Sequence, residues 1–225
     1  MSNETEHQQC VDLTIAYFQV RGIACEDFEL QVGHAAVRRP DLTLPEFHTL
    51  IEVKTFKRLE KEREEEQRLG QDFLAGKVSA YFYPTFYNRF DKDLRHARQK
   101  FREYPKHHTA VLFFDQHSMF HKQSPEDLLL GQEYYTFAFP NDASQNSGPL
   151  RYGRNKRQLR QDKNHEIGAV VFHTVGNAFQ VFHNRFADTG RRIHPDIFAL
   201  PEDEHFEYID DSGDPKIIPF KQKEV

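Results

Sequence analysis

Arg39-Pro40-Asp41 is followed, after ten intervening residues, by Glu52-Val53-Lys54 inside the apolar segment Leu50-Ile51-Glu52-Val53-Lys54. Side chains alternate across a strand, so in a strand over this segment Glu52 and Lys54 share one face and Val53 points to the other. Asp41 begins a second alternating run over 41–44, and residues 45–48 are typical of a connection between strands. If the two runs pair as a hairpin, Asp41 and Glu52 lie side by side.

Two adjacent carboxylates and a lysine indicate a particular chemistry. The carboxylates repel each other unless something positive neutralises them. A hard divalent cation such as Mg²⁺ is held by one or two carboxylates together with waters and substrate phosphate. Such an ion lowers the pKa of a bound water and stabilises charge on phosphate oxygens, and a lysine on the same face can orient that water. Asp41, Glu52 and Lys54 therefore predict a metal-dependent phosphodiesterase site.

Pro40-Asp41 and Glu52-Val53-Lys54 resemble the two signature elements of the PD-(D/E)XK nuclease superfamily, also called the restriction-endonuclease-like fold. The resemblance covers these motif residues rather than an aligned chain. It implies that Asp41 and Glu52 are metal ligands, that the Val53 carbonyl is a further ligand, and that Lys54 activates or positions the attacking water. Many members also use an acid on the first helix, for which the candidates are Glu6 and Asp12, with Glu29 on the first strand as a third option.

The order of elements expected from the sequence is that of the superfamily core. Apolar periodicity predicts a helix over 5–21, ended by Gly22, and alternation predicts a first strand over 28–32. A second helix is expected over 91–103, and the apolar run 109–114 predicts a strand covered on both faces. The expected fold is α/β, with an αβββαβ core and a central mixed sheet flanked by helices.

The remaining segments are expected to decorate one domain over 1–225, whose core spans about 5–140. An insertion over 57–88 begins with a charged, solvated helix, because acidic and basic residues balance there. Residues 141–165 are expected to form a mobile basic loop. A β-hairpin extension follows over 166–200, with a turn at Gly176-Asn177, and 201–225 is an acidic tail.

Composition places the chain in the soluble globular class, with 38% hydrophobic and 29% charged residues. Cys10 and Cys25 are the only cysteines, so neither a disulfide framework nor a four-cysteine zinc cluster is expected. The N-terminal residues lack a signal-peptide pattern, and no apolar run approaches the length of a membrane span. We therefore expect a cytoplasmic protein with no membrane partner.

The formal net charge of −5 means that a nucleic-acid surface must come from local basic clusters. One cluster is a stripe on the helix predicted over 91–103, which includes Arg95 and Arg98. The other lies in the predicted basic loop and includes Arg151, Arg154, Lys156 and Arg157. Both clusters are candidates for binding DNA phosphates. Cleavage of both DNA strands would favour a homodimer.

The function expected is hydrolysis of DNA phosphodiester bonds by a Mg²⁺-dependent deoxyribonuclease, with Mn²⁺ able to substitute. Two alternatives stay open. The first is a noncatalytic nucleic-acid-binding or assembly protein that keeps the nuclease fold. The second is a hydrolase that binds zinc through some of the thirteen histidines, although these are scattered rather than placed one helical turn apart around a glutamate.

Overall fold

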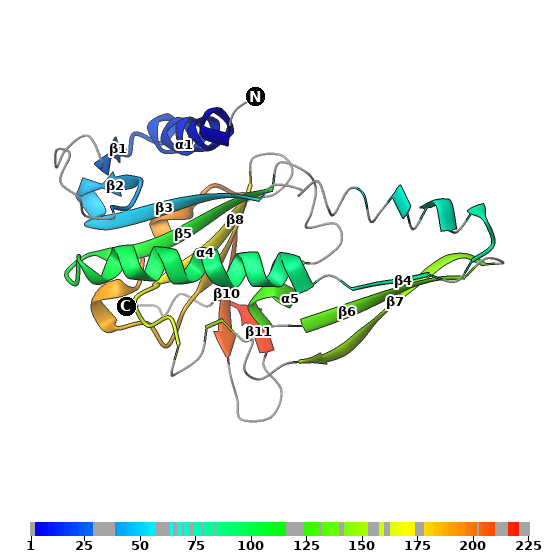
Figure 1. Cartoon of the computed structure of the whole chain (residues 1–225). Coiled ribbons are helices and arrows are strands. Elements are labelled where there is room, and N and C mark those ends of the chain that lie inside the picture. The colour runs from blue at the N-terminus through cyan, green and yellow to red at the C-terminus, as the bar shows by residue number, and fades with distance from the viewer. Residues whose placement is uncertain are drawn as a thin grey trace. The chain divides into compact units, whose positions relative to one another are not determined.

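The computed structural model describes residues 3–28, 39–56, 64, 67–68, 70–72, 74–77, 79–82, 84–115, 124–130, 132–139, 142–152, 158–159, 163–173, 178–201, 203–209 and 216–220 (Figure 1). The chain divides into two compact units. The first contains Met1–Phe56, Lys92–Gln116 and Leu159–Val225, and the second contains Lys57–Asp91 and His117–Gln158. The expected α/β class with a mixed sheet and helices is confirmed.

An eight-stranded mixed sheet forms the centre of the first unit, with the strand order β1-β2-β3-β5-β8-β9-β10-β11. The strands β3, β5 and β8 run parallel to one another, β2 pairs antiparallel with β3, and β9 runs antiparallel to β8 and parallel to β10. Their bounds are Glu26–Asp27, Leu42–Leu44, Thr49–Phe56, His108–Asp115, Ala169–His173, Phe179–His183, Glu204–Ile209 and Lys216–Pro219, in the order given.

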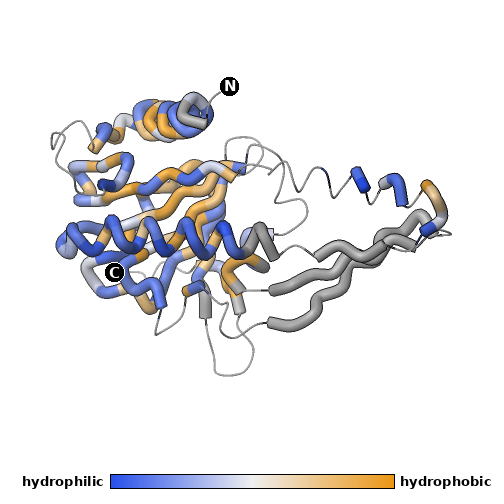
Figure 2. Tube along the Cα trace, in the orientation of Figure 1, coloured by the Kyte–Doolittle hydropathy of each residue, from blue (hydrophilic) through white to orange (hydrophobic). Residues whose placement is uncertain are grey.

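Both faces of the central strands are buried, which is why β5 and β8 are almost continuously apolar. One face carries Val53, Leu112 and Val171 in register and packs with α1 (Asn3–Val20) through residues that include Phe18. The other face carries Glu52 and Lys54, and the part of α4 (Pro84–Arg102) that belongs to the first unit, from Lys92 onward, lies over it (Figure 1). Figure 2 shows β3, β5 and β8 as largely hydrophobic and α4 as largely hydrophilic.

The helix predicted over 5–21 and the strand predicted over 109–114 are confirmed as α1 and β5. The second helix is longer than predicted, because it begins at Pro84 rather than near Asp91. Proline suits the first turn of a helix, where its missing N–H has no partner to lose. The first strand that the structure describes is Glu26–Asp27, and the strand predicted over 28–32 lies, apart from Phe28, outside the described residues. Within the part of the chain that is described, no helix is long and apolar enough to cross a membrane.

The C-terminal region contributes more to the sheet than expected. The predicted hairpin is confirmed as β8 and β9, which pair antiparallel. The segment predicted as an acidic tail instead supplies β10 and β11, and Phe206 of β10 stacks on Phe182 of β9 with ring centroids 5.1 Å apart. The tail was predicted from the acidic residues of this segment, but its alternating aromatic and aliphatic residues allow it to pair with the sheet.

The second unit contains an antiparallel three-stranded sheet in the order β4-β6-β7 and the short helix α5. Their bounds are Ser79–Phe82, Gln132–Phe139, Asp142–Tyr152 and, for α5, Pro125–Leu130. The prediction of a loop over 141–165 is wrong for Asp142–Tyr152, because β6 offers a strand edge whose backbone hydrogen bonds outweigh a weak intrinsic preference. Of the predicted charged helix, residues 64 and 67–68 are helical, and most of the rest lies outside the described residues.

A buried histidine pair joins β9 to β10. Only 7% of His183 is exposed, and its Nε2 lies 2.9 Å from Nδ1 of His205. The other ring nitrogen of His205 donates to the carbonyl of Phe198, so Nδ1 of a neutral His205 must accept the hydrogen bond from His183. Burial, and then the nearby His205, lower the pKa of His183 to about 3.

We expect this histidine to make the protein sensitive to acid. His183 takes up a proton near pH 6.5 in the unfolded chain and only near pH 3 in the folded protein. The free energy of unfolding is therefore highest above pH 6.5, and it falls as the pH drops from 6.5 towards 3. In denaturant titrations, the wild type should lose about 2 kcal/mol more unfolding free energy than His183→Gln between pH 7 and pH 5. The half-exposed His165, replaced by Gln, serves as the control and should retain the wild-type dependence. If the unfolding free energies of wild type and His183→Gln fell by equal amounts between pH 7 and pH 5, the prediction would be contradicted.

Candidate active site

The β2–β3 hairpin brings the two predicted carboxylates together. Its register pairs Leu42 with Ile51, so the next position places Asp41 opposite Glu52. Opposite residues in an antiparallel pair have Cα atoms about 4.5–5.5 Å apart. Beyond the last pair of the ladder, Oδ2 of Asp41 accepts a hydrogen bond of 2.7 Å from the backbone N–H of Val53. The hairpin predicted from the sequence is confirmed, and Asp41 is held in place at its open end.

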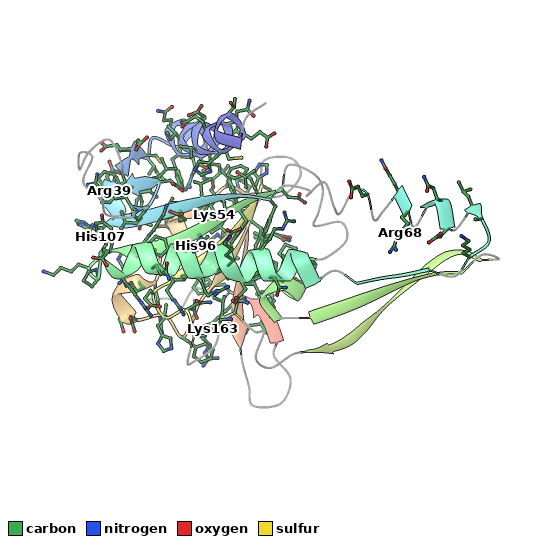
Figure 3. The ribbon with its side chains drawn as sticks, in the orientation of Figure 1. Arg39, Lys54, Arg68, His96, His107 and Lys163 are labelled. Atoms are coloured by element: carbon green, nitrogen blue, oxygen red, sulfur yellow. The ribbon has the colours of Figure 1, made fainter. Side chains whose placement is uncertain are left out.

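Glu52 and Lys54 share one face of β3, as their spacing predicts. Nζ of Lys54 lies 2.5 Å from Oε1 of Glu52, and the Glu52 side chain is 0% exposed. Figure 3 shows Lys54 on the side of β3 where α4 lies. The structure therefore gathers Asp41, Glu52 and Lys54 within the first unit, around β3 and the residue that precedes β2.

A second lysine enters the site from α4. Nζ of Lys100 lies 2.7 Å from Oε1 and 2.8 Å from Oε2 of Glu52, and 3.7 Å from Oδ1 of Asp41. Sequence reasoning missed this contact, because Lys100 there was one of many basic residues on an amphipathic helix. The available signal was its position between Ala97 and Phe101 on the buried stripe of α4.

The first helix brings a histidine to the carboxylate pair. Nε2 of His7 lies 3.7 Å from Oδ1 of Asp41. Asp12 is exposed and accepts a hydrogen bond of 2.9 Å from Gln8, one turn earlier on α1. Glu6 is half-buried beside His7, and Glu29 lies outside the described residues. His7 is thus the α1 residue that the structure brings to Asp41.

The pKa values of the two acids shift in opposite directions. Burial, followed by the charge of Asp41, raises the pKa of Glu52 above its ordinary value. Burial acts in the same direction on Asp41, but the His7 imidazole and the Lys100 ammonium outweigh it and lower the pKa of Asp41. Burial alone would lower the pKa of Lys54, whereas the adjacent Glu52 carboxylate raises it. Lys54 therefore acts here as a positive charge beside Glu52.

The predicted DNA-binding residues are only partly placed. Arg95 is exposed and Arg98 half-buried on α4, the helix that also carries Lys100. Arg151 lies in β7 of the second unit, opposite Glu133 of β6. Arg154, Lys156 and Arg157 lie outside the described residues. Of these predicted residues, Arg95 is therefore the exposed one that lies in the same unit as the carboxylates.

The oxygen atoms of this site suit a hard divalent cation. Asp41 and Glu52 supply two carboxylates, and the Val53 carbonyl points to the same side of β3 as its N–H, which faces Asp41. Among the described residues, no group of three or more His, Cys, Asp or Glu side chains is arranged to hold a metal ion. Two carboxylates are nevertheless sufficient for Mg²⁺, which usually retains several waters and substrate oxygens.

Comparison with known proteins gives no family for this chain: no family model matches it, and neither does any curated protein or solved structure. Inference about function therefore depends on the geometry of the carboxylate pair and its lysines.

Proposed function

We propose that this protein is a Mg²⁺-dependent deoxyribonuclease of PD-(D/E)XK type that hydrolyses DNA phosphodiester bonds. The observation that carries the proposal is the position of Asp41 opposite Glu52, with Lys54 on the same face of β3 as Glu52. Apart from β4, which belongs to the three-stranded sheet, the element order α1-β1-β2-β3-α4-β5 and the neighbouring strands β1-β2-β3-β5 support a restriction-endonuclease-like core. Mg²⁺, or Mn²⁺ in its place, belongs to the proposal.

Asp41, Glu52 and the Val53 carbonyl would hold the metal ion. When bound, the ion supplies Lewis acidity and lowers the pKa of a coordinated water. Asp41 is oriented by the N–H of Val53, so its carboxylate is already positioned before any ligand arrives. The ammonium of Lys54, fixed by Glu52, orients the attacking water and stabilises the charge that develops on the phosphate.

DNA is the proposed partner because the same helix that delivers Lys100 exposes Arg95 to solvent. An arginine on the exposed surface of α4 can bind a backbone phosphate and offset the repulsion between acidic residues and DNA. If both strands of a duplex are cut, two copies of the chain would supply the two sites.

We expect Lys54→Met to reduce cleavage by about 10²-fold or more, because the variant keeps the side-chain length and loses the positive charge that acts on the phosphate. Linear, nicked, branched and single-stranded DNA would be incubated with Mg²⁺ or Mn²⁺, with EDTA as the blank. Lys92→Met is the matched control, since Lys92 is exposed on α4, and it should cleave like the wild type.

Three outcomes would contradict the proposal or part of it. Undiminished cleavage by a folded Lys54→Met variant would remove Lys54 from the site. Wild-type protein that binds DNA and never cuts it with either metal would favour the noncatalytic binding or assembly protein. Tightly held zinc in the purified protein would instead favour a histidine-based hydrolase.

A further inference from the structure

Lys100 lies between the two carboxylates that the proposed function assigns to the metal ion. Its ammonium is within 2.8 Å of both oxygens of Glu52 and 3.7 Å from Oδ1 of Asp41. Lys54 differs, since it contacts Glu52 from the neighbouring position on the same strand. Lys100 thus bridges two acids that come from different strands, as a shared metal ion would.

A divalent cation and the Lys100 ammonium need the same oxygen atoms. The Glu52 side chain is fully buried, so charges around it are poorly screened by water, and two cations at such separations repel strongly. The ion and the ammonium therefore cannot both occupy the space between Asp41 and Glu52.

The lysine is able to leave. Its side chain is 18% exposed, and a flexible four-carbon stem allows the ammonium to move towards water while the backbone of α4 stays in place. Removal of Lys100 leaves the pair of acids partly neutralised by Lys54. A doubly charged ion can then replace the missing positive charge.

We propose that Lys100 is a displaceable counter-cation, which neutralises Asp41 and Glu52 in the metal-free protein and competes with Mg²⁺ or Mn²⁺ for them. This inference rests on the proposed metal-dependent function and deepens it. Lys100 in this view weakens metal binding while it stabilises the metal-free fold. The negative charges of Asp41 and Glu52 are thus neutralised by Lys100 in the metal-free protein and by the metal ion when it is bound.

The test measures Mn²⁺ binding by titration calorimetry without DNA, together with thermal unfolding in EDTA and in Mn²⁺. We expect Lys100→Met to bind Mn²⁺ at least about 10-fold more tightly than the wild type, because the competing charge is gone. Its unfolding temperature should fall in EDTA and rise more on metal addition than that of the wild type. Lys100→Arg keeps the charge and should bind metal as weakly as the wild type, and Lys92→Met is the control for a lost surface lysine.

The outcomes separate this inference from the function on which it rests. Wild-type binding of Mn²⁺ with equal or weaker binding by Lys100→Met overturns the counter-cation and leaves the nuclease proposal standing. If Lys100→Met binds Mn²⁺ and the wild type does not, the competition is supported. If neither protein binds Mn²⁺, both the counter-cation and the metal-dependent function are wrong.

Discussion

Glu52→Gln should lower Mg²⁺-dependent DNA cleavage by about 10³-fold or more, the largest effect on activity that we expect. Glutamine has nearly the same volume and keeps one acceptor oxygen, so the change removes the charge rather than the shape. Two lysines contact this carboxylate, and its loss leaves Asp41 as the acid of the pair. A metal ion would then be held by one carboxylate in a strongly positive environment. The measurement is the single-turnover cleavage rate at saturating Mg²⁺.

Loss of folding must be distinguished from loss of chemistry, because removing one partner of a buried ion pair costs about 3–5 kcal/mol. The double variant Glu52→Gln with Lys100→Met also removes one of the two lysine charges that lose their partner when Glu52 is replaced. It should be more stable than Glu52→Gln alone and equally inactive. Glu166→Gln is a control acid, since Glu166 pairs with the exposed Arg102, and it should cleave normally. A folded Glu52→Gln variant with wild-type cleavage would refute the assignment of Glu52.

The carboxylate pair could be predicted from sequence because its geometry is local. A strand fixes the shared face of Glu52 and Lys54, and a tight connection between β2 and β3 places Asp41 opposite Glu52. Apolar periodicity likewise indicates the buried face of α4, and less well that of α1, where Leu13 and Val20 are exposed. It does not determine how far each helix is rotated or shifted on the sheet, so the positions of His7 and Lys100 could not be derived.

The strands β7, β10 and β11 were missed for a related reason. They lie in segments whose overall composition is polar or acidic, and such composition alone indicates a loop or tail. A neighbouring strand such as β6 or β9 supplies the hydrogen-bonding edge that makes the extended conformation favourable. The parallel pairing of β9 with β10 also joins strands that no tight turn connects, which a local pattern cannot describe.

Gly168→Ala should destabilise the first unit by about 3 kcal/mol or more, because a methyl group has no space there. A Cβ atom at this position would lie 1.8 Å from the backbone oxygen of Arg191 and 2.8 Å from that of Thr109. The N–H of Gly168 also donates to this Thr109 oxygen at 3.0 Å, and Gly168 directly precedes β8. The clash therefore falls where β8 meets β5, the neighbour of the strand that carries Glu52.

Neither backbone can move aside cheaply. Arg191 is buried, and its guanidinium donates to the carbonyl of Tyr104 at 2.7 Å, which holds this segment against the end of α4. Gly190→Ala is the matched control, because a Cβ at Gly190 meets nothing within 4 Å and should change stability little. The measurement is the denaturant midpoint of the two variants and the wild type. Equal midpoints for Gly168→Ala and Gly190→Ala would contradict the prediction, because they would show that the backbone at the junction of β5 and β8 moves to accept the methyl group.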